Sequence, residues 1–218
     1  MDMQFGQLAG NVSINAGIYA CLAKVNPKDV AKFFKNFRTQ PPAQAHHTYR
    51  ELLVGANLSD HGLQPRYDLE IDGKTPDWSL LDEQEKVIGI VELPTFHQNA
   101  QLDREIGETL GRGEIWAGWM PQNTGRLYQK VQQKAERYAR LAGSAQVPYV
   151  VAVFGEFTAS VDLAEVEEVL FSSHGGAFTH FPWLCGLLYF EESSGIYAFK
   201  CYANSDARRA LPLQTARI

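Results

Sequence analysis

The sequence predicts an α/β protein with a central mixed sheet flanked by helices. Three strand-like runs follow one another at residues 66–71, 75–81 and 86–93, and a fourth apolar run occupies residues 147–154. A stretch with helical spacing of apolar residues precedes the three runs, and another separates them from the fourth. The resulting order, αβββαβ, is typical of proteins whose helices lie against a sheet.

The first helix is expected over residues 26–37, with Pro27 in its first turn. Its apolar stripe consists of Val30, Phe33, Phe34 and Phe37. The pair Pro41-Pro42 ends it, because proline cannot continue a helix.

A second helix is expected over residues 45–58, with apolar residues at positions 49, 52, 53 and 56. Glu51 lies on the flank of this stripe, where its side chain can reach the edge of a sheet and remain partly hydrated. The simpler alternative is a surface glutamate without a role.

Two turns connect the three strand-like runs. Asp72-Gly73 joins the first to the second, and residues 82–85 join the second to the third. If Asp82 and Glu85 close the latter turn, Asp77 pairs with Ile90. Glu92 is then a diagonal neighbour of Asp77 on the same face, roughly 7–8 Å away.

Two carboxylates at the edge of an apolar sheet repel each other. Asp77 and Glu92 therefore predict one of three outcomes. One of them takes up a proton, both bind a divalent cation, or a lysine supplies the counter-charge.

This arrangement resembles the PD-(D/E)XK nuclease superfamily, whose signature is Pro-Asp on one strand and Glu-x-Lys on the next. Pro76-Asp77 matches the first half and Glu92-Leu93 the second, whereas Pro94 stands at the lysine position. The resemblance covers about residues 45–154 and includes a preceding helix that carries an acidic residue, Glu51. It implies a restriction-endonuclease-like αβββαβ core.

The resemblance also implies roles for these residues. Asp77, Glu92 and the carbonyl of Leu93 would hold Mg²⁺ or Mn²⁺, and Glu51 would position a second ion or a water. The substrate would be nucleic acid, with DNA the expected kind.

The helix expected over residues 126–141 supplies a candidate for the missing lysine. Its apolar period predicts an inward position at Lys134, and the acidic pair is the available anion there. Lys130, one turn earlier, is the second candidate. The alternative is that Lys134 lays its methylenes on apolar surface and keeps its charge in water.

Basic residues gather around this core although the net charge is −5. The cations expected to contact nucleic acid are Arg126, Lys130 and Arg137. A second basic group, at residues 24–50, is either another wall for nucleic acid or an ordinary solvated helix face.

The chain is expected to form one domain over residues 1–218. A helical region at residues 1–44 precedes the core, and a helix and a hairpin follow it at residues 155–218. The three widely spaced cysteines indicate neither a disulfide framework nor a zinc site, which favours a cytoplasmic protein. Neither a signal peptide nor a membrane span is expected, and a homodimer is left open.

The remaining segments carry weaker signals. A short helix is expected near residues 102–110, a loop or lid at 111–121, a helix at 161–171, and a hairpin of strands 183–190 and 195–202. Ser172 and His174 lie in a glycine loop that lacks the context of a hydrolase nucleophile. His97 is of interest for its nearness to Glu92.

The predicted function is metal-dependent cleavage of phosphodiester bonds in nucleic acid. The alternative, which Pro94 favours, is a catalytically inactive relative that uses the same fold for binding or assembly. An enzyme that acts on small molecules is a weaker third hypothesis, because no sugar- or nucleotide-binding signature accompanies the acidic pair.

Overall fold

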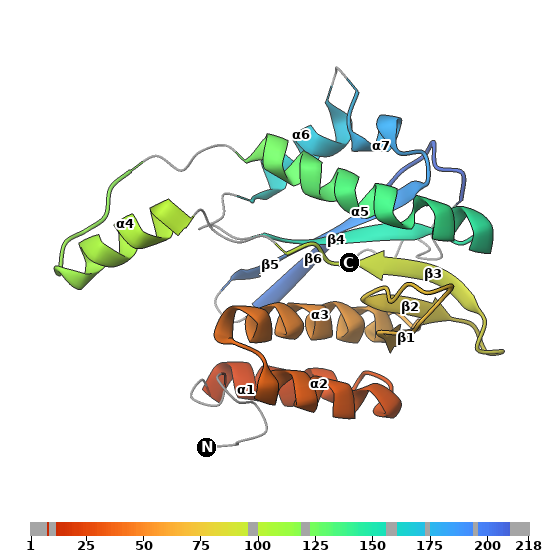
Figure 1. Ribbon diagram of the computed structural model, residues 1–218, viewed down its shortest axis with the longest axis horizontal. Coiled ribbons are helices and arrows are strands. Elements are labelled where there is room, and N and C mark those ends of the chain that lie inside the picture. The colour runs from red at the N-terminus through yellow and green to blue at the C-terminus, as the bar shows by residue number, and fades with distance from the viewer. Residues whose placement is uncertain are drawn as a thin grey trace.

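One six-stranded sheet organises the molecule, and helices cover both of its faces (Figure 1). The computed structural model describes residues 8, 12–95, 100–118, 123–155, 161–172, 175–193 and 196–209. The helices are α1 (Val12–Leu22), α2 (Pro27–Thr39), α3 (Pro42–Asp60), α4 (Ala100–Gly111), α5 (Thr124–Ala145), α6 (Leu163–Phe171) and α7 (Ala177–His180). The strands are β1 (Gln64–Tyr67), β2 (Trp78–Leu81), β3 (Val87–Glu92), β4 (Tyr149–Gly155), β5 (Leu184–Ser193) and β6 (Ile196–Ala203).

The strands lie in sequence order across the sheet. β1, β2 and β3 form an antiparallel meander, β3, β4 and β5 run parallel, and β6 returns antiparallel to β5. Parallel neighbours need a long crossover, and α5 supplies the one between β3 and β4. The sheet is therefore mixed, as the sequence predicts.

Two hydrophobic cores lie on opposite faces of the sheet. α3 covers one face with α1 and α2 beneath it, and α5, α6 and α7 cover the other (Figure 1). Phe33 and Trp78 belong to the first core, whereas Tyr138 and Tyr149 belong to the second. β4 is buried on both faces, which explains why its sequence is an uninterrupted apolar run.

The helices predicted before the sheet are confirmed with wider bounds. α2 begins after Asn26, whose side chain accepts a hydrogen bond from the backbone N–H of Lys28. α3 begins at Pro42, three residues before the expected start, because proline fits the first turn of a helix. α1 lies within the region at residues 1–44 that was expected to be helical, but its bounds were not predicted, since its sequence lacks a clear apolar stripe.

The prediction of a strand over residues 66–71 is wrong. β1 ends at Tyr67, and Asp68 adopts a left-handed conformation with φ of 48° that turns the chain out of the ladder. The turn at Asp72-Gly73 does form, within a small bridge between Ile71 and Lys74.

The predicted pairing of Asp77 with Ile90 is also wrong. Ser79 lies opposite Ile90 and Trp78 opposite Val91. The turn after β2 is wider than expected, and a bulge lies between Leu80 and Leu81. A slip of two residues keeps the same face of the strand toward the same core, so the acidic residues still share a face.

The C-terminal part agrees with the expected helix and hairpin. α6 and the pair β5 and β6 occupy the predicted segments within two or three residues, whereas the short α7 was not predicted. Within the described part of the chain, the helices are too short or too polar to cross a membrane.

Candidate functional site

Asp77 and Glu92 interlock where β2 and β3 meet. The backbone N–H of Asp77 donates to Glu92 Oε1 at 3.0 Å, and the backbone N–H of Leu93 donates to Asp77 Oδ2 at 2.6 Å. Each carboxylate is thus aligned by the backbone of the opposite strand. Because one side of each carboxylate is fixed in this way, the remaining oxygen lone pairs have a defined direction.

Lys134 of α5 lies against both carboxylates. Its Nζ donates to Glu92 Oε2 at 2.5 Å and lies 3.9 Å from Asp77 Oδ2. The lysine side chain is 21% exposed, so the pair is partly shielded from water.

The expected contact of Lys134 with the acidic pair is confirmed, whereas the expectation that it is buried within the apolar stripe of α5 is wrong. The inward positions of this helix belong to Leu127, Val131, Ala135 and Tyr138. Ala135 takes the central place, and Lys134 lies on the flank beside it. From there its long side chain reaches the edge of the sheet.

The surroundings of Asp77 disfavour its charged form. Burial raises the pKa of Asp77 well above its usual range, and the charge of Glu92 raises it further. Lys134 and the N–H of Leu93 oppose this shift without cancelling it. The site therefore favours either a proton on Asp77 or an additional cation.

Two tyrosines border the carboxylates on the α5 face of the sheet. The rings of Tyr138 and Tyr149 stack with centroids 5.7 Å apart. Burial, followed by the charge of Glu92, raises the pKa of both phenols, so both remain protonated donors. Tyr149 is fully buried, and its hydroxyl has no hydrogen-bond partner within the described part of the chain. The hydroxyl of Tyr149 is therefore a hydrogen-bond donor without a partner among the described residues, close to Asp77 and Glu92.

Glu51 comes from α3, on the other face of the sheet. It is 6% exposed, so the expected partial hydration of this residue is wrong. Tyr67 Oη donates to Glu51 Oε2 at 2.6 Å, and His47 Nε2 lies 3.2 Å from Oε1. Its carboxylate is held by these two residues, and its charge contributes to the raised pKa of Asp77.

The other cations expected at the site lie along α5. Arg126 and Lys130 occupy its first two turns, before Lys134. The guanidinium of Arg137 lies over the ring of Tyr138, 5.4 Å from its centroid. His97 and His174 lie outside the described residues.

The oxygen donors here suit a hard divalent cation. Mg²⁺ is commonly held by one or two carboxylates together with waters and substrate phosphates. Asp77 and Glu92 meet that requirement and carry surplus negative charge. Over the described residues, no group of three or more His, Cys, Asp or Glu side chains is placed to hold a metal, so the site does not form an all-protein cage.

Several residues around the site were not singled out from the sequence. His47 precedes Glu51 by four residues on one helix, a spacing that brings side chains together and could have identified it. Tyr67 and Tyr149 carry no comparable signal, because only the closing of the sheet brings them near Glu51 and Glu92.

Comparisons with protein-family models, with curated proteins and with solved structures each found no match. The geometry and charge of Asp77, Glu92 and Lys134 are therefore the basis on which a function can be inferred.

Proposed function

We propose that this protein is a metal-dependent nuclease that hydrolyses phosphodiester bonds of nucleic acid, with DNA as the expected substrate. The observation that carries the proposal is the approach of Lys134 to the interlocked carboxylates of Asp77 and Glu92. Two carboxylates beside one lysine are the groups that phosphoryl chemistry needs, anions for a metal and a cation for the phosphate.

The arrangement of elements supports the same proposal. α3, the meander β1 to β3, α5 and β4 match the order αβββαβ, with α4 as an additional helix between β3 and α5. We assign this part to the restriction-endonuclease-like class, with Asp77 at the start of β2 and Glu92 at the end of β3. Lys134 then replaces, from α5, the lysine that the motif places where Pro94 stands.

In the proposed mechanism, Asp77, Glu92 and the carbonyl of Leu93 would hold Mg²⁺ or Mn²⁺, and the ion would supply Lewis-acid chemistry to the scissile phosphate and the attacking water. Lys134 donates to the phosphate oxygen on which negative charge develops, or orients the nucleophile. Glu51, held by Tyr67 and His47 on the α3 face, would add negative charge that favours a cation at Asp77, since its charge raises the pKa of Asp77.

A second candidate function is a catalytically inactive binding or assembly module of the same fold. The observation that favours it is the ion pair between Lys134 and Glu92, which supplies counter-charge without a metal. In that case the three charged residues would stabilise the edge of the sheet and bind no ion.

Cleavage by purified protein separates the two functions. We expect Mg²⁺- or Mn²⁺-dependent hydrolysis of an oligonucleotide, and a loss of about 10²-fold or more in Lys134→Met, since the ammonium stabilises charge in the transition state. Lys130→Met, one turn earlier on the same helix, is the matched control and should cleave nearly as well as wild type. Equal rates for the two variants would remove Lys134 from the mechanism.

Metal binding can be followed independently of cleavage. Mn²⁺ should raise the melting temperature of the wild-type protein, because an ion that binds only the folded state stabilises it. Asp77→Ala should abolish that shift, whereas Glu83→Ala in the exposed turn after β2 should retain it. A full Mn²⁺ shift in Asp77→Ala would exclude a metal site shared by Asp77 and Glu92.

A further inference from the structure

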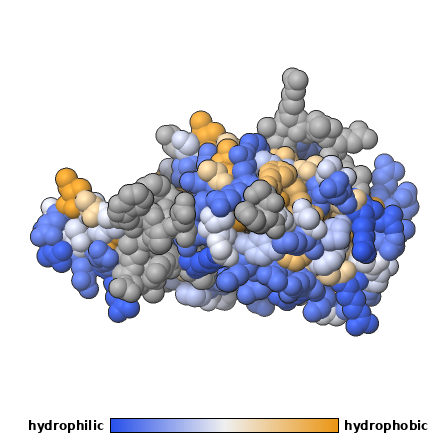
Figure 2. Space-filling model, turned by 90° about the horizontal axis from the view of Figure 1, so that it is seen from above, coloured by the Kyte–Doolittle hydropathy of each residue, from blue (hydrophilic) through white to orange (hydrophobic). Residues whose placement is uncertain are grey.

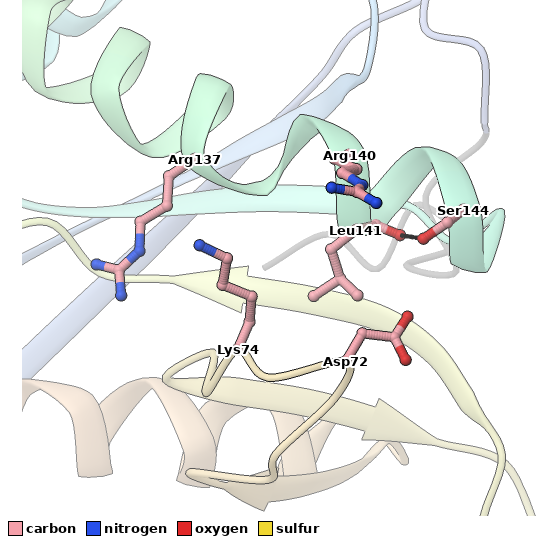
Figure 3. Close-up of a pocket in the computed structure, with 6 residues that line it drawn as sticks. All are labelled: Asp72, Lys74, Arg137, Arg140, Leu141 and Ser144. Atoms are coloured by element: carbon pink, nitrogen blue, oxygen red, sulfur yellow. Dashed lines mark hydrogen bonds between the residues drawn. The ribbon is translucent and has the colours of Figure 1, made fainter.

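A basic pocket lies beside the acidic site, between the loop that precedes β2 and the second half of α5 (Figure 3). Its volume is about 340 Å³. The lining residues are Asp72, Lys74, Arg137, Arg140, Leu141 and Ser144. Three cations and one carboxylate give the pocket a positive balance.

The loop side of the pocket is built rigidly. Ile71 and Lys74 exchange two backbone hydrogen bonds, of 2.7 and 2.9 Å, across the left-handed residues Asp72 and Gly73. Tyr138 Oη of α5 donates to the carbonyl of Thr75 at 3.2 Å, which ties the loop to the helix. The position of Lys74 is therefore determined by this turn and its attachment to α5.

Two of the pocket cations, Lys74 and Arg137, extend toward each other (Figure 3). Lys74 extends from the loop toward α5, and Arg137 extends from α5 toward the loop (Figure 3). Within the described part of the chain, Lys74, Arg137 and Arg140 form no ion pair within 4.0 Å, although Asp72 lines the same pocket. Like charges gathered without anionic partners repel each other, and an anion in the pocket relieves that repulsion.

We propose that this pocket binds backbone phosphate of the strand whose scissile phosphate lies at Asp77 and Glu92, an inference that rests on the proposed nuclease function. Arg137 follows Lys134 by three residues on α5, which places their Cβ atoms about 5–6 Å apart. Arg140 lies about 9 Å along the helix from Lys134, at 1.5 Å per residue.

That distance matches the spacing of phosphates along a strand. Phosphates in a duplex advance about 3.4 Å per nucleotide along the axis and lie farther apart than this through space, so a distance of about 9 Å reaches a phosphate close to the scissile one on the same strand. The pocket thus holds a phosphate near the bond that is cut, on the same strand. It fixes the register of the strand without reading its sequence.

The surface around α5 is compatible with such a polyanion. Viewed from the α5 side, the molecule is mainly hydrophilic, with an apolar area near its middle (Figure 2).

The test compares two double variants that each remove two exposed positive charges. Arg137→Gln/Arg140→Gln alters the pocket, and Lys35→Gln/Arg38→Gln alters α2 on the other face of the sheet. Affinity for a fluorescent oligonucleotide is measured in EDTA as a function of salt concentration. We expect the pocket variant to lose roughly tenfold in affinity, and its salt slope to fall by about 1.4 for single strands or about 1.8 for duplex.

The control variant Lys35→Gln/Arg38→Gln should change neither the affinity nor the salt slope by a comparable amount. Lys74→Gln, a single change in the exposed turn, should lower the slope by about 0.7 for single strands and provides a second variant on the loop side. Equal losses in the pocket and control doubles would overturn the inference.

The source of the phosphate is determined with strands that carry or lack a 5′-phosphate. If a terminal phosphate fills the pocket, the 5′-phosphate raises affinity in wild type and not in Arg137→Gln/Arg140→Gln. If an internal phosphate fills it, both strands bind alike and both lose affinity in the variant. Either pattern supports phosphate binding.

Cleavage assays on the same proteins separate this inference from the nuclease proposal. Metal-dependent cleavage together with an unchanged salt slope in the pocket variant would refute the pocket alone. Loss of binding in the pocket variant of a protein that does not cleave would refute the nuclease proposal and leave the phosphate pocket standing. Absence of oligonucleotide binding by wild type would refute both.

Discussion

Asp77 is the residue whose ionisation is most sensitive to its surroundings. Its neighbours Glu92 and Lys134 pull its pKa in opposite directions, and burial and Glu92 together prevail. The charged form of Asp77 therefore lowers the stability of the folded protein when no further cation is present. The free energy of unfolding should accordingly depend on pH.

We expect Asp77→Asn to be more stable than wild type at pH 7 in EDTA. Because the pKa of Asp77 is raised on folding, the folded state binds the proton more tightly than the unfolded state does. The stability that this provides is present below the unfolded pKa of about 3.9 and is lost as pH rises through the folded pKa. The advantage of Asp77→Asn should therefore shrink as pH falls toward 4, as urea unfolding at several pH values would show.

Asn is a suitable replacement because its amide oxygen can still accept the hydrogen bond from the N–H of Leu93. Glu83→Gln, in the exposed turn after β2, is the control and should change the unfolding midpoint little. A lower midpoint for Asp77→Asn at pH 7 would show that Lys134 makes the charged form of Asp77 favourable.

Sequence patterns predicted part of this residue arrangement. Asp77 and Glu92 were expected on one face, and they share it despite the wrong register, because side chains in a strand alternate with a period of two. The helical spacing of apolar residues predicted an inward position at Lys134. Tertiary packing brings Tyr67 to Glu51 and Tyr149 close to Glu92. No local sequence pattern predicts either approach.

At the scale of elements, α3 and β2 approach each other unusually closely. Trp78 is fully buried, and its Nε1 donates to the carbonyl of Glu51 at 2.9 Å. The indole lies over Gly55, where an added Cβ would come within 2.1 Å of Trp78 Cζ2. Only glycine leaves room for this packing, which in turn holds the start of β2 and thus Asp77 in place.

We expect Gly55→Ala to destabilise the protein by about 1–3 kcal/mol, the usual cost of overpacking a core. Alanine favours a helix over glycine by up to about 1 kcal/mol, so the clash must outweigh that gain. Gly143→Ala in α5 is the matched control, because an added Cβ there meets nothing within 4 Å. Equilibrium unfolding in urea measures both, and equal or opposite effects would contradict the close packing of α3 on Trp78.

The elements with strong periodicity or long apolar runs were predictable, and the short ones were not. α2, α3, α5 and β4 follow from such patterns. β1 is shorter than expected because Asp29, distant in sequence, accepts a hydrogen bond from the N–H of Tyr67 at 3.0 Å, and because Asp68 turns left-handed. Both causes are specific contacts or conformations that a β-favouring sequence does not reveal.

At the scale of the whole molecule, the sheet separates a structural face from the face that carries the candidate site. The face covered by α1, α2 and α3 contains the core that includes Trp78, and the buried Glu51 comes from α3 on the same face. The face covered by α5 carries the carboxylates and the basic pocket at the same end of the β1 to β3 meander. The net charge of −5 repels nucleic acid at long range, so binding depends on cations gathered at the site.

This charge distribution predicts how nucleic acid and metal should depend on each other. Without a divalent ion, Asp77 and Glu92 repel a phosphate that approaches the site. We expect the double variant Asp77→Asn/Glu92→Gln to bind an oligonucleotide roughly fivefold to tenfold more tightly than wild type in EDTA, because two like charges are removed and Lys134 is released from its ion pair.

The control for that prediction is Glu83→Gln/Glu168→Gln, which removes two exposed carboxylates that do not contact Lys134. It changes the net charge by the same amount as the site variant does. Fluorescence anisotropy in EDTA and then in Mn²⁺ gives the two affinities for each protein. Mn²⁺ should strengthen binding by wild type and by the control, since the ion turns a repulsive site into an attractive one, and should leave the Asp77→Asn/Glu92→Gln variant nearly unchanged. If the variant and the control bind alike in EDTA, the acidic pair does not face the phosphate backbone, and its ion pair with Lys134 is then a feature of the fold alone.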